Sequence, residues 1–328
     1  MCIRDSIYGV KGKPNINIFI MHPTGRVSPI QEMQMTSVID KNIFNIGING
    51  TFDDCQYIMK STFSDLDFKD KYNLGAINSV NWSRVLAQIV YYFYSGLKIM
   101  KNYGSSSVRF SVPTGNFGNI LAGWMAKKMG LPISKLICGS NQNDILTRFF
   151  ENGIMKRKNV SPSYSPSMDI QVSSNFERLL YEINDRDTNL VKKQMNEFKV
   201  DGNFQISQDQ LNKINNLFAA FKISDFDTLN IIKKIYIDHK YMLDPHSAIG
   251  YGAVQKAIEQ KIISNNCPVI SLACAHPAKF PEVIKKSIGI RPKSSTHLEK
   301  IMRQKENFKL IEPNLKDIQE YIKKTMRK

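Results

Sequence analysis

The 328 residues, 42% of them apolar, are enough for one large α/β domain or two smaller ones with a real hydrophobic core. No segment approaches the roughly 20 consecutive apolar residues of a membrane helix, and the N-terminus lacks the apolar run of a secretory signal. We therefore expect a cytoplasmic protein with no membrane partner.

Charge and cysteine content narrow the class of protein further. The net charge is +16, but the 45 basic residues are spread along the whole chain and the aromatic residues do not alternate with arginines. We therefore expect no nucleic-acid partner. The five cysteines are an odd, scattered set without a CxxC pair, which argues against a disulfide framework and a zinc site.

The N-terminal part of the chain has an α/β pattern. Residues 1–6 do not fit this pattern, and we interpret them as a non-native leader. Beyond them, strand-like and helix-like segments alternate. In chain order we expect a strand at Ile18–Met21, a helix that Ser28 and Gln31 cap and that continues to about Val38, a strand at Ile43–Ile48, and a helix that Thr51 and Asp54 cap and that continues to about Phe63.

The rest of the chain continues this alternation. Residues 153–244 show weak periodicity, so we expect an insertion of peripheral helices and loops there, and a charged helical tail from about Pro292. The other expected elements are a helix at Asn81–Tyr103, a strand at Val108–Val112, a helix at Ile120–Met129, a strand at Leu136–Cys138, a helix at Pro245–Gln260 that Asp244 caps, and a strand at Val269–Ala273.

A polar loop between a strand and a helix is the first candidate site. In this geometry, main-chain N–H groups and the helix N-terminus face an anion, and glycines permit its close approach. The alternative is an ordinary strand-to-helix turn, which needs glycine for its own backbone angles. The motif is neither a Walker A nor a GxGxxG loop, and the residues alone leave both interpretations open. The loop consists of Thr114, Gly115, Asn116, Phe117, Gly118 and Asn119.

A second candidate anion site lies at the start of the long helix, at Asn78, Ser79 and Asn81. Arg84 falls in the first turn, where a cation opposes the positive end of the helix dipole, and a bound anion relieves that conflict. A capping Asn or Ser beside a solvated arginine is the alternative, and the residues by themselves favour it. One of the two sites suits a cofactor phosphate and the other a substrate phosphate.

Two further pairs of residues are interpreted as structural. Gly250 and Gly252 look like part of a dinucleotide fingerprint, but they lie inside the helix that follows Pro245, where glycine permits close packing. Cys274 and His276 point the same way on a strand, yet two ligands do not make a metal site. We expect no bound metal.

Seven segments, in order and in register, resemble threonine synthases of the bacterial and fungal type across about residues 8–290. So many motifs together are far more specific than any single loop. The segments are 22–34 (HPTGRVSPIQEMQ), 50–56 (GTFDDCQ), 78–92 (NSVNWSRVLAQIVYY), 112–123 (VPTGNFGNILAG), 143–150 (NDILTRFF), 167–178 (SMDIQVSSNFER) and 275–280 (AHPAKF).

The resemblance implies a fold-type II pyridoxal-phosphate enzyme of the tryptophan-synthase-β-like class, an α/β protein with three αβα layers and two domains. It implies conversion of O-phospho-L-homoserine and water to L-threonine and phosphate, with pyridoxal 5'-phosphate (PLP) as the electron sink. By position, Asn78, Ser79 and Arg84 match residues that hold the substrate phosphate, and Arg26 matches a basic residue with a similar role. The matches to the cofactor site are Gly115, Asn116, Phe117, Gly118, Asn119 and Cys274.

Two departures from the family pattern matter. Family members usually carry Thr at the position of Cys274, where a hydroxyl faces the pyridine nitrogen, and a thiol is a weaker hydrogen-bonding group. Relatives also place the Schiff-base lysine upstream of the first strand seen here, and this sequence has no match to it. Lys69, between Phe68 and Asp70, resembles the surroundings of that lysine. We expect Lys69 in a charged loop, however, and reject it as the catalytic residue. We therefore expect an N-terminally incomplete chain without activity.

We expect residues 7–74 to complete a small mobile domain and residues 75–328 to form the large PLP-binding domain, in a monomer or homodimer. Two other functions stay open: another fold-type II lyase or dehydratase, and a non-catalytic protein that binds phosphorylated ligands. A second anion site at Asn78, Ser79 and Arg84 distinguishes the first of these, because substrates without a phosphate have no use for it.

Overall fold

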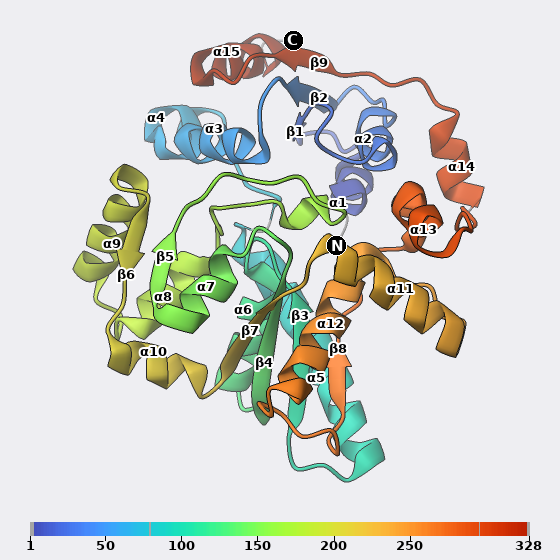
Figure 1. Ribbon diagram of the computed structural model, residues 1–328. Helices are drawn as coiled ribbons and strands as arrows, with labels where there is room; N and C mark the ends of the chain where they lie inside the picture. The colour runs from blue at the N-terminus through green and yellow to red at the C-terminus, as the bar shows by residue number, and fades with distance from the viewer. Residues whose placement is uncertain (1–2, 79, 295, 327–328) are drawn as a thin grey trace. The chain divides into compact units, whose positions relative to one another are not determined.

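The computed structural model describes residues 3–78, 80–294 and 296–326, without the side chains of residues 3–6 and 297–298. The chain forms two compact units, each of which is described by itself (Figure 1). Unit 1 consists of residues 1–77, 278–280 and 293–328, and unit 2 of residues 78–277 and 281–292.

Unit 1 is built on a parallel sheet with the strand order β1-β2-β9. Along β1, Ile18 and Ile20 face one apolar cluster and Phe19 and Met21 face another, as expected for a sheet buried on both faces. The elements are β1 (Ile18–Pro23), β2 (Ile43–Ile48), β9 (Lys309–Ile311), α1 (Ile3–Val10), α2 (Pro29–Thr36), α3 (Phe52–Ser64), α4 (Leu66–Lys71), α14 (Thr296–Met302) and α15 (Leu315–Met326).

The expected helix starts in unit 1 are confirmed. Ser28 and Gln31 form a reciprocal capping box at α2, and Thr51 and Asp54 form another at α3. The expected loop around Lys69 is wrong, since this residue lies in the short helix α4, which Asp65 caps.

The C-terminal tail belongs to unit 1, whereas the sequence analysis placed all of residues 75–328 in the larger domain. β9 extends the sheet by pairing with β2, and α15 buries Ile318 and Ile322 in the same cluster as Ile46. The strand β9 has only three residues, too few to show a hydrophobic period, so the sequence pattern indicated only helix.

Unit 2 is built on a second parallel sheet, with the order β7-β4-β3-β8. Its elements are α5 (Trp82–Tyr103), β3 (Val108–Pro113), α6 (Gly118–Lys128), β4 (Ile133–Ser140), α7 (Ile145–Asn152), β5 (Ile154–Lys156), α8 (Phe176–Ile183), α9 (Thr188–Val200), β6 (Asn203–Gln205), α10 (Gln208–Asn215), β7 (Phe218–Lys222), α11 (Asp225–His239), α12 (Pro245–Glu259), β8 (Val269–Ser271) and α13 (Pro281–Ile288).

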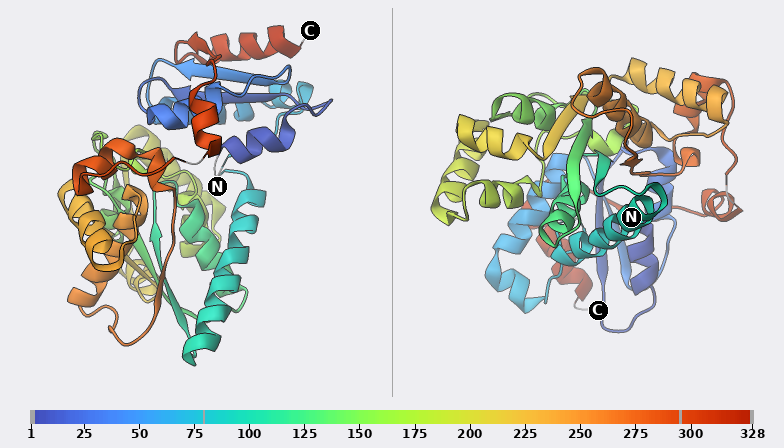
Figure 2. Two further views of the ribbon diagram at one scale, coloured as in Figure 1. Left: turned by 90° about the vertical axis from the view of Figure 1, so that its right-hand side faces the viewer. Right: turned by 90° about the horizontal axis from the view of Figure 1, so that it is seen from below.

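Helices cover both faces of this sheet, which gives unit 2 three αβα layers. Along β4, Leu136 and Cys138 join the large cluster that includes α5 and α6, whereas Ile137 joins the cluster of α12. Figure 2 shows α5 on one side of the strands and α11 and α12 on the other. The glycines of α12 permit close packing as expected, because a Cβ on Gly250 meets Pro113 Cγ at 2.9 Å and one on Gly252 meets Ile231 Cδ1 at 2.6 Å.

Residues 153–244 are not a peripheral insertion, contrary to the sequence analysis. The segment supplies β7, which pairs with β4 from Leu136↔Phe218 to Ser140↔Lys222. It also buries Phe176, Leu180 and Phe204 in the largest apolar cluster. The weak periodicity of β7 has a physical reason, since the strand FAAFK is partly buried on both faces and does not alternate between apolar and polar residues.

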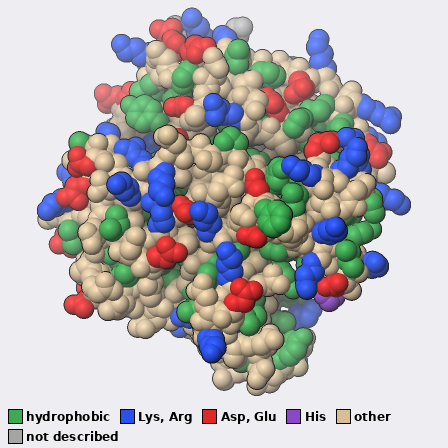
Figure 3. All heavy atoms as spheres, viewed as in Figure 1, with side chains coloured by type: hydrophobic (Ala, Val, Ile, Leu, Met, Phe, Trp, Pro, Cys, Tyr) green, Lys and Arg blue, Asp and Glu red, His purple; other side chains and the backbone are tan. Residues whose placement is uncertain are grey.

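Among the described residues, no helix is long and apolar enough to cross a membrane, and no group of three His, Cys, Asp or Glu side chains could hold a metal ion. Cys55, Cys138, Cys267 and Cys274 are free cysteines. On the face that Figure 3 shows, Lys and Arg side chains are interspersed with Asp and Glu.

Replacement of Ile318 by Ala is expected to lower the free energy of unfolding by about 2–4 kcal/mol, because a buried side chain is removed and a cavity remains. Ile318 is 1% exposed in unit 1. Urea unfolding followed by circular dichroism measures this change. The matched control is Leu310→Ala on β9, which is 57% exposed and is expected to cost less than about 0.5 kcal/mol. Equal effects of both variants would show that the tail does not pack on unit 1.

Candidate functional site

The carboxyl ends of four parallel strands meet along one edge of the unit 2 sheet. β3 ends before the loop of residues 114–117, and β8 ends before residues 272–275. The two strands pair through Ser111↔Ser271, and Leu272 N donates to Ser111 O at 2.9 Å, so both segments leave the sheet side by side. Ligands of open α/β sheets bind at such an edge.

The loop after β3 is held through its carbonyl groups. Ser173 Oγ donates to Gly115 O at 2.8 Å, and Asn175 donates to Asn116 O from its main-chain N at 3.1 Å and from Nδ2 at 2.9 Å. In a trans peptide, the N–H points opposite to the C=O. The amides of Asn116 and Phe117 are therefore directed away from residues 173–175. With the first-turn N–H groups of α6, they form an arrangement suited to an anion.

Phe117 contributes its main chain to this loop, and its side chain serves as an anchor. Its φ is 62°, in the left-handed region that is costly for a residue with a Cβ. The ring is 1% exposed and lies 5.3 Å from the ring of Phe176 and 6.2 Å from that of Phe218, measured between centroids. Burial of the ring offsets the backbone strain.

Gly115 is required by packing within unit 2. A Cβ at this position would lie 2.8 Å from the main-chain oxygen of Ser167 and 3.3 Å from Met168 Cα. The ordinary structural reason for a glycine therefore applies to Gly115, whatever the loop binds.

Asn119 connects α6 to α5. Tyr91 donates its hydroxyl to Asn119 Oδ1 at 2.6 Å, and Tyr92 donates to Asn119 O at 2.9 Å. Burial raises the pKa of Tyr92 well above its usual value, so this hydroxyl stays a donor. Burial and then the nearby Cys274 raise the pKa of Tyr91.

The turn before α5 has a defined hydrogen-bonded geometry. Val80 N donates to Asn78 Oδ1 at 3.0 Å, and Asn81 N donates to Asn78 O at 3.0 Å. Asn81 caps α5 by accepting from Ser83 N at 2.9 Å, which confirms the expected cap. Ser79 lies outside the described residues.

Both helix N-termini lie at the carboxyl edge of the sheet. α5 precedes β3 and α6 follows it, and the contacts of Tyr92 with Asn119 and of Gly96 with Leu131 show that the two helices run parallel. Along the axis of α5, Trp82 lies about 14 Å before Tyr91, whose hydroxyl contacts Asn119. The partly buried Arg84 is in the first turn of α5, where its N donates to Asn81 O at 3.0 Å.

A buried network that the sequence analysis missed holds the segment after β8. Asp244 Oδ2 accepts from the Ser247 hydroxyl and, at 3.3 Å, from Ala275 N. Ser247 Oγ in turn accepts from Cys274 N at 2.9 Å. Asp244 was identified only as a helix cap, and the spacing of three residues to Ser247 was the signal that could have indicated the network.

Asp244 stays ionised in this network. Burial by itself raises its pKa, but hydrogen bonds and charge from His246, together with the Ser247 hydroxyl, outweigh burial and hold the pKa below its ordinary value. His246 Nδ1 lies 3.1 Å from Asp244 Oδ1.

The residues expected to form the site fall into two sets. The loop residues 115–119, Cys274, Asn78 and Arg84 belong to unit 2. Arg26 belongs to unit 1, where it lies exposed in the turn after β1.

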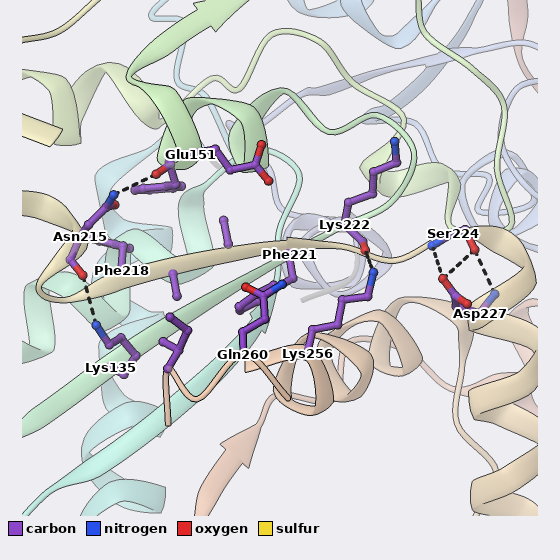
Figure 4. Close-up of a pocket in the computed structure, with 14 residues that line it drawn as sticks. Lys135, Glu151, Asn215, Phe218, Phe221, Lys222, Ser224, Asp227, Lys256 and Gln260 are labelled. Atoms are coloured by element: carbon purple, nitrogen blue, oxygen red, sulfur yellow. Dashed lines mark hydrogen bonds between the residues drawn. The ribbon is translucent and has the colours of Figure 1, made fainter. Parts of the chain in front are cut away.

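Two pockets in the described part of unit 2 lie away from these residues. A pocket of about 430 Å³ lies beside β7, and Figure 4 shows three lysines around it. Each ammonium already has an acceptor, because Lys135 donates to Asn215 O, Lys222 to Asp144 and Lys256 to Lys222 O. A second pocket of about 600 Å³ lies against α6, α8 and α10. None of the expected site residues lines either pocket.

Comparisons with known proteins agree with this geometry. The family model described as threonine synthase, C-terminal, matches residues 247–322. Threonine synthase of Saccharomyces cerevisiae is 45% identical over 87% of this chain, and that of Pseudomonas aeruginosa is 41% identical over 97%. The structure of PLP-bound threonine synthase from Brucella melitensis superposes with a TM-score of 0.86 at 42% identity, and the match covers 99% of this chain and 68% of that one.

The chain belongs to the threonine synthase family. The TM-score to the Brucella structure also confirms the expected fold-type II architecture. The chain spans 58% of the length of the yeast threonine synthase and 66% of that of the Pseudomonas threonine synthase.

In this threonine synthase family member, Gly115→Ala is expected to lower the free energy of unfolding by about 1–3 kcal/mol, because the new Cβ meets main-chain atoms that cannot rotate away. Thermal and urea unfolding measure the change. Gly75→Ala, with no atom within 4 Å of the added Cβ, is the matched control. A stability equal to that of the control would contradict the close approach to Ser167.

The Asp244 network predicts a pH dependence. Because the folded-state pKa is lowered, the carboxylate contributes stability that is present above its unfolded pKa of about 3.9 and is lost as the pH falls through the folded value. The difference in free energy of unfolding between wild type and Asp244→Asn is therefore expected to be largest at neutral pH and to shrink below about pH 4. Urea unfolding from pH 3 to 7 measures it. A difference that is independent of pH would refute the ionised network.

Proposed function

We propose the threonine synthase reaction for this protein, the conversion of O-phospho-L-homoserine and water to L-threonine and phosphate by an enzyme that carries the family's Schiff-base lysine. The inactivity expected of the chain as given stays a prediction. The observation that supports this most is the position of two anion-binding arrangements, the 114–119 loop and the turn at residues 78–84, at one edge of unit 2. Identities of 41–45% to threonine synthases over most of the chain support the same reaction.

PLP is the cofactor in this proposal, as in the Brucella relative. The residues present fit its phosphate, because the loop carbonyls are tied back to Ser173 and Asn175 and the loop amides are left on the opposite side. When bound, PLP supplies an electron sink for carbanion chemistry on the substrate.

The chain positions the cofactor through main-chain atoms more than through side chains. Gly115, Asn116, Phe117, Gly118 and the amide of Asn119 hold the cofactor phosphate in this proposal. Cys274 takes the place beside the pyridine nitrogen. Its thiol bonds more weakly than a hydroxyl, so the rigid hold of the Asp244 network on its main chain becomes more important.

The substrate phosphate is assigned to Asn78, Ser79 and Arg84. The phosphate leaves the γ-carbon, a hydroxyl from water adds at the β-carbon, and the negative charge on the leaving oxygen grows during the first step. A fixed guanidinium and the N-terminus of α5 stabilise that charge. The similar role that the resemblance gives to Arg26 stays a prediction, as do a cytoplasmic location, a monomeric or homodimeric state, and the absence of nucleic-acid and membrane partners.

Arg84→Gln is expected to lower kcat/KM for O-phosphohomoserine by about 30- to 100-fold, the effect of losing one charged hydrogen bond. The assay measures phosphate release and threonine formation by the PLP-loaded full-length enzyme. Lys98→Gln, an exposed cation further along α5, is the control and is expected to retain full activity.

The wild-type assay separates the alternatives. Dehydration of serine or threonine without phosphate release from O-phosphohomoserine would identify a dehydratase. Phosphate binding without turnover of any of these substrates would identify a binding protein. Either result overturns the proposed function.

A further inference from the structure

A short segment of unit 2, residues 173–178, contacts both candidate anion sites. At its start, Ser173 and Asn175 hold the loop after β3. At its end, Arg178 Nη2 donates to the carbonyl of Val80, in the turn before α5. Arg178 N donates to Asn175 O at 3.2 Å, so the two contacts are part of one rigid turn at the start of α8.

The contact with Val80 fixes a specific peptide. The carbonyl of Val80 and the N–H of Asn81 belong to one peptide unit and point in opposite directions. Asn81 N donates to Asn78 O on one side, and Arg178 donates to Val80 O on the other. The peptide between Val80 and Asn81 is therefore fixed by a hydrogen bond on each side, and Arg178 donates one of the two.

Only part of the guanidinium is used by this contact. Nη1 of Arg178 is buried and has no hydrogen-bond partner among the residues that the structure describes. A buried N–H of a charged group without an acceptor costs about 1–3 kcal/mol or more. The guanidinium is planar and its two terminal nitrogens are adjacent, so Nη1 lies next to the turn that Nη2 contacts.

No carboxylate in the described part of the chain neutralises Arg178. Glu182 is four residues further along α8, at the spacing where an ion pair with Arg178 could form. It pairs instead with Arg186, with 3.1 Å between Nε and Oε1. The positive charge at the turn is thus left for a ligand, and an anion with several oxygens suits the fork of an arginine.

We propose that Arg178 is a further substrate-binding residue, whose Nη1 binds the phosphate group of a phosphomonoester while Nη2 keeps the Asn78–Asn81 turn in place. This inference rests on the proposed function and deepens it, because it adds a second guanidinium of unit 2 to Arg84 at the substrate phosphate. It also explains why one segment contacts both sites: the spacing between cofactor phosphate and substrate phosphate is set by residues 173–178.

The test compares Arg178→Gln and Arg178→Lys with wild type. Binding of inorganic phosphate is measured by isothermal titration calorimetry, with and without saturating PLP, and KM and kcat for O-phosphohomoserine are measured with the PLP-loaded full-length enzyme. Arg178→Gln is expected to weaken phosphate binding and raise KM by about 10- to 100-fold, with a smaller change in kcat. Arg178→Lys keeps the positive charge but loses the forked pair of terminal nitrogens. Its phosphate affinity and KM are expected to lie between those of wild type and Arg178→Gln.

The control variant is Lys192→Gln, an exposed cation on α9, which is expected to bind phosphate as wild type does. Thermal unfolding shows whether each variant is folded. Wild-type phosphate affinity and KM in both Arg178 variants would overturn the inference. So would an equal loss of phosphate and PLP affinity in the folded Arg178→Lys variant, which would assign Arg178 a structural role alone.

The two proposals fail in different ways. If wild type binds phosphate through Arg178 but does not act on O-phosphohomoserine, the proposed function fails and the binding role of Arg178 stands. If the full-length wild type is active and Arg178→Gln retains the wild-type KM, the proposed function stands and the inference about Arg178 fails.

Discussion

The hydrogen bonds from residues 173–178 to main-chain carbonyls are the constraint on which the candidate site depends. They fix three peptides, at Gly115, Asn116 and Val80. Each bond orients a carbonyl toward the segment and so turns the N–H of the same peptide the other way. A loop that could rotate these peptides would present carbonyl oxygens to an anion as readily as amides. The segment therefore gives the edge of an ordinary parallel sheet the arrangement of amides on which the proposed anion site depends.

The electrostatics of this edge follow from local groups, not from the net charge of the chain. The N-termini of α5 and α6 and two arginines contribute positive charge, while the carboxylate of Asp244 lies at the same edge. The hydrogen bonds that Asp244 accepts from Ser247 and from the amide of Ala275 compensate its charge inside unit 2. A buried, fully bonded carboxylate can thus support the segment that carries Cys274 without opposing a nearby anion.

Much of the fold could be predicted from the sequence, because the relevant signals are local. The capping boxes at Ser28 and Thr51 and the cap at Asn81 were recognised from residue type and spacing, and the structure has them. β7 and β9 were missed, since each is short and gains its stability from a partner strand distant in sequence. For the same reason, the return of the C-terminal tail to unit 1 could not be predicted.

The sequence by itself determined the family, the strand-loop-helix at residues 108–128 and the residue types of the two proposed anion sites, because motifs and helix starts depend on neighbours along the chain. The tertiary structure decided how those residues act. It gave the ring of Phe117 an anchoring role, directed Asn119 toward Tyr91 and Tyr92, and brought Arg178 to the turn at Val80. These roles depend on contacts between segments up to about a hundred residues apart, and such contacts form only when packing fixes both partners.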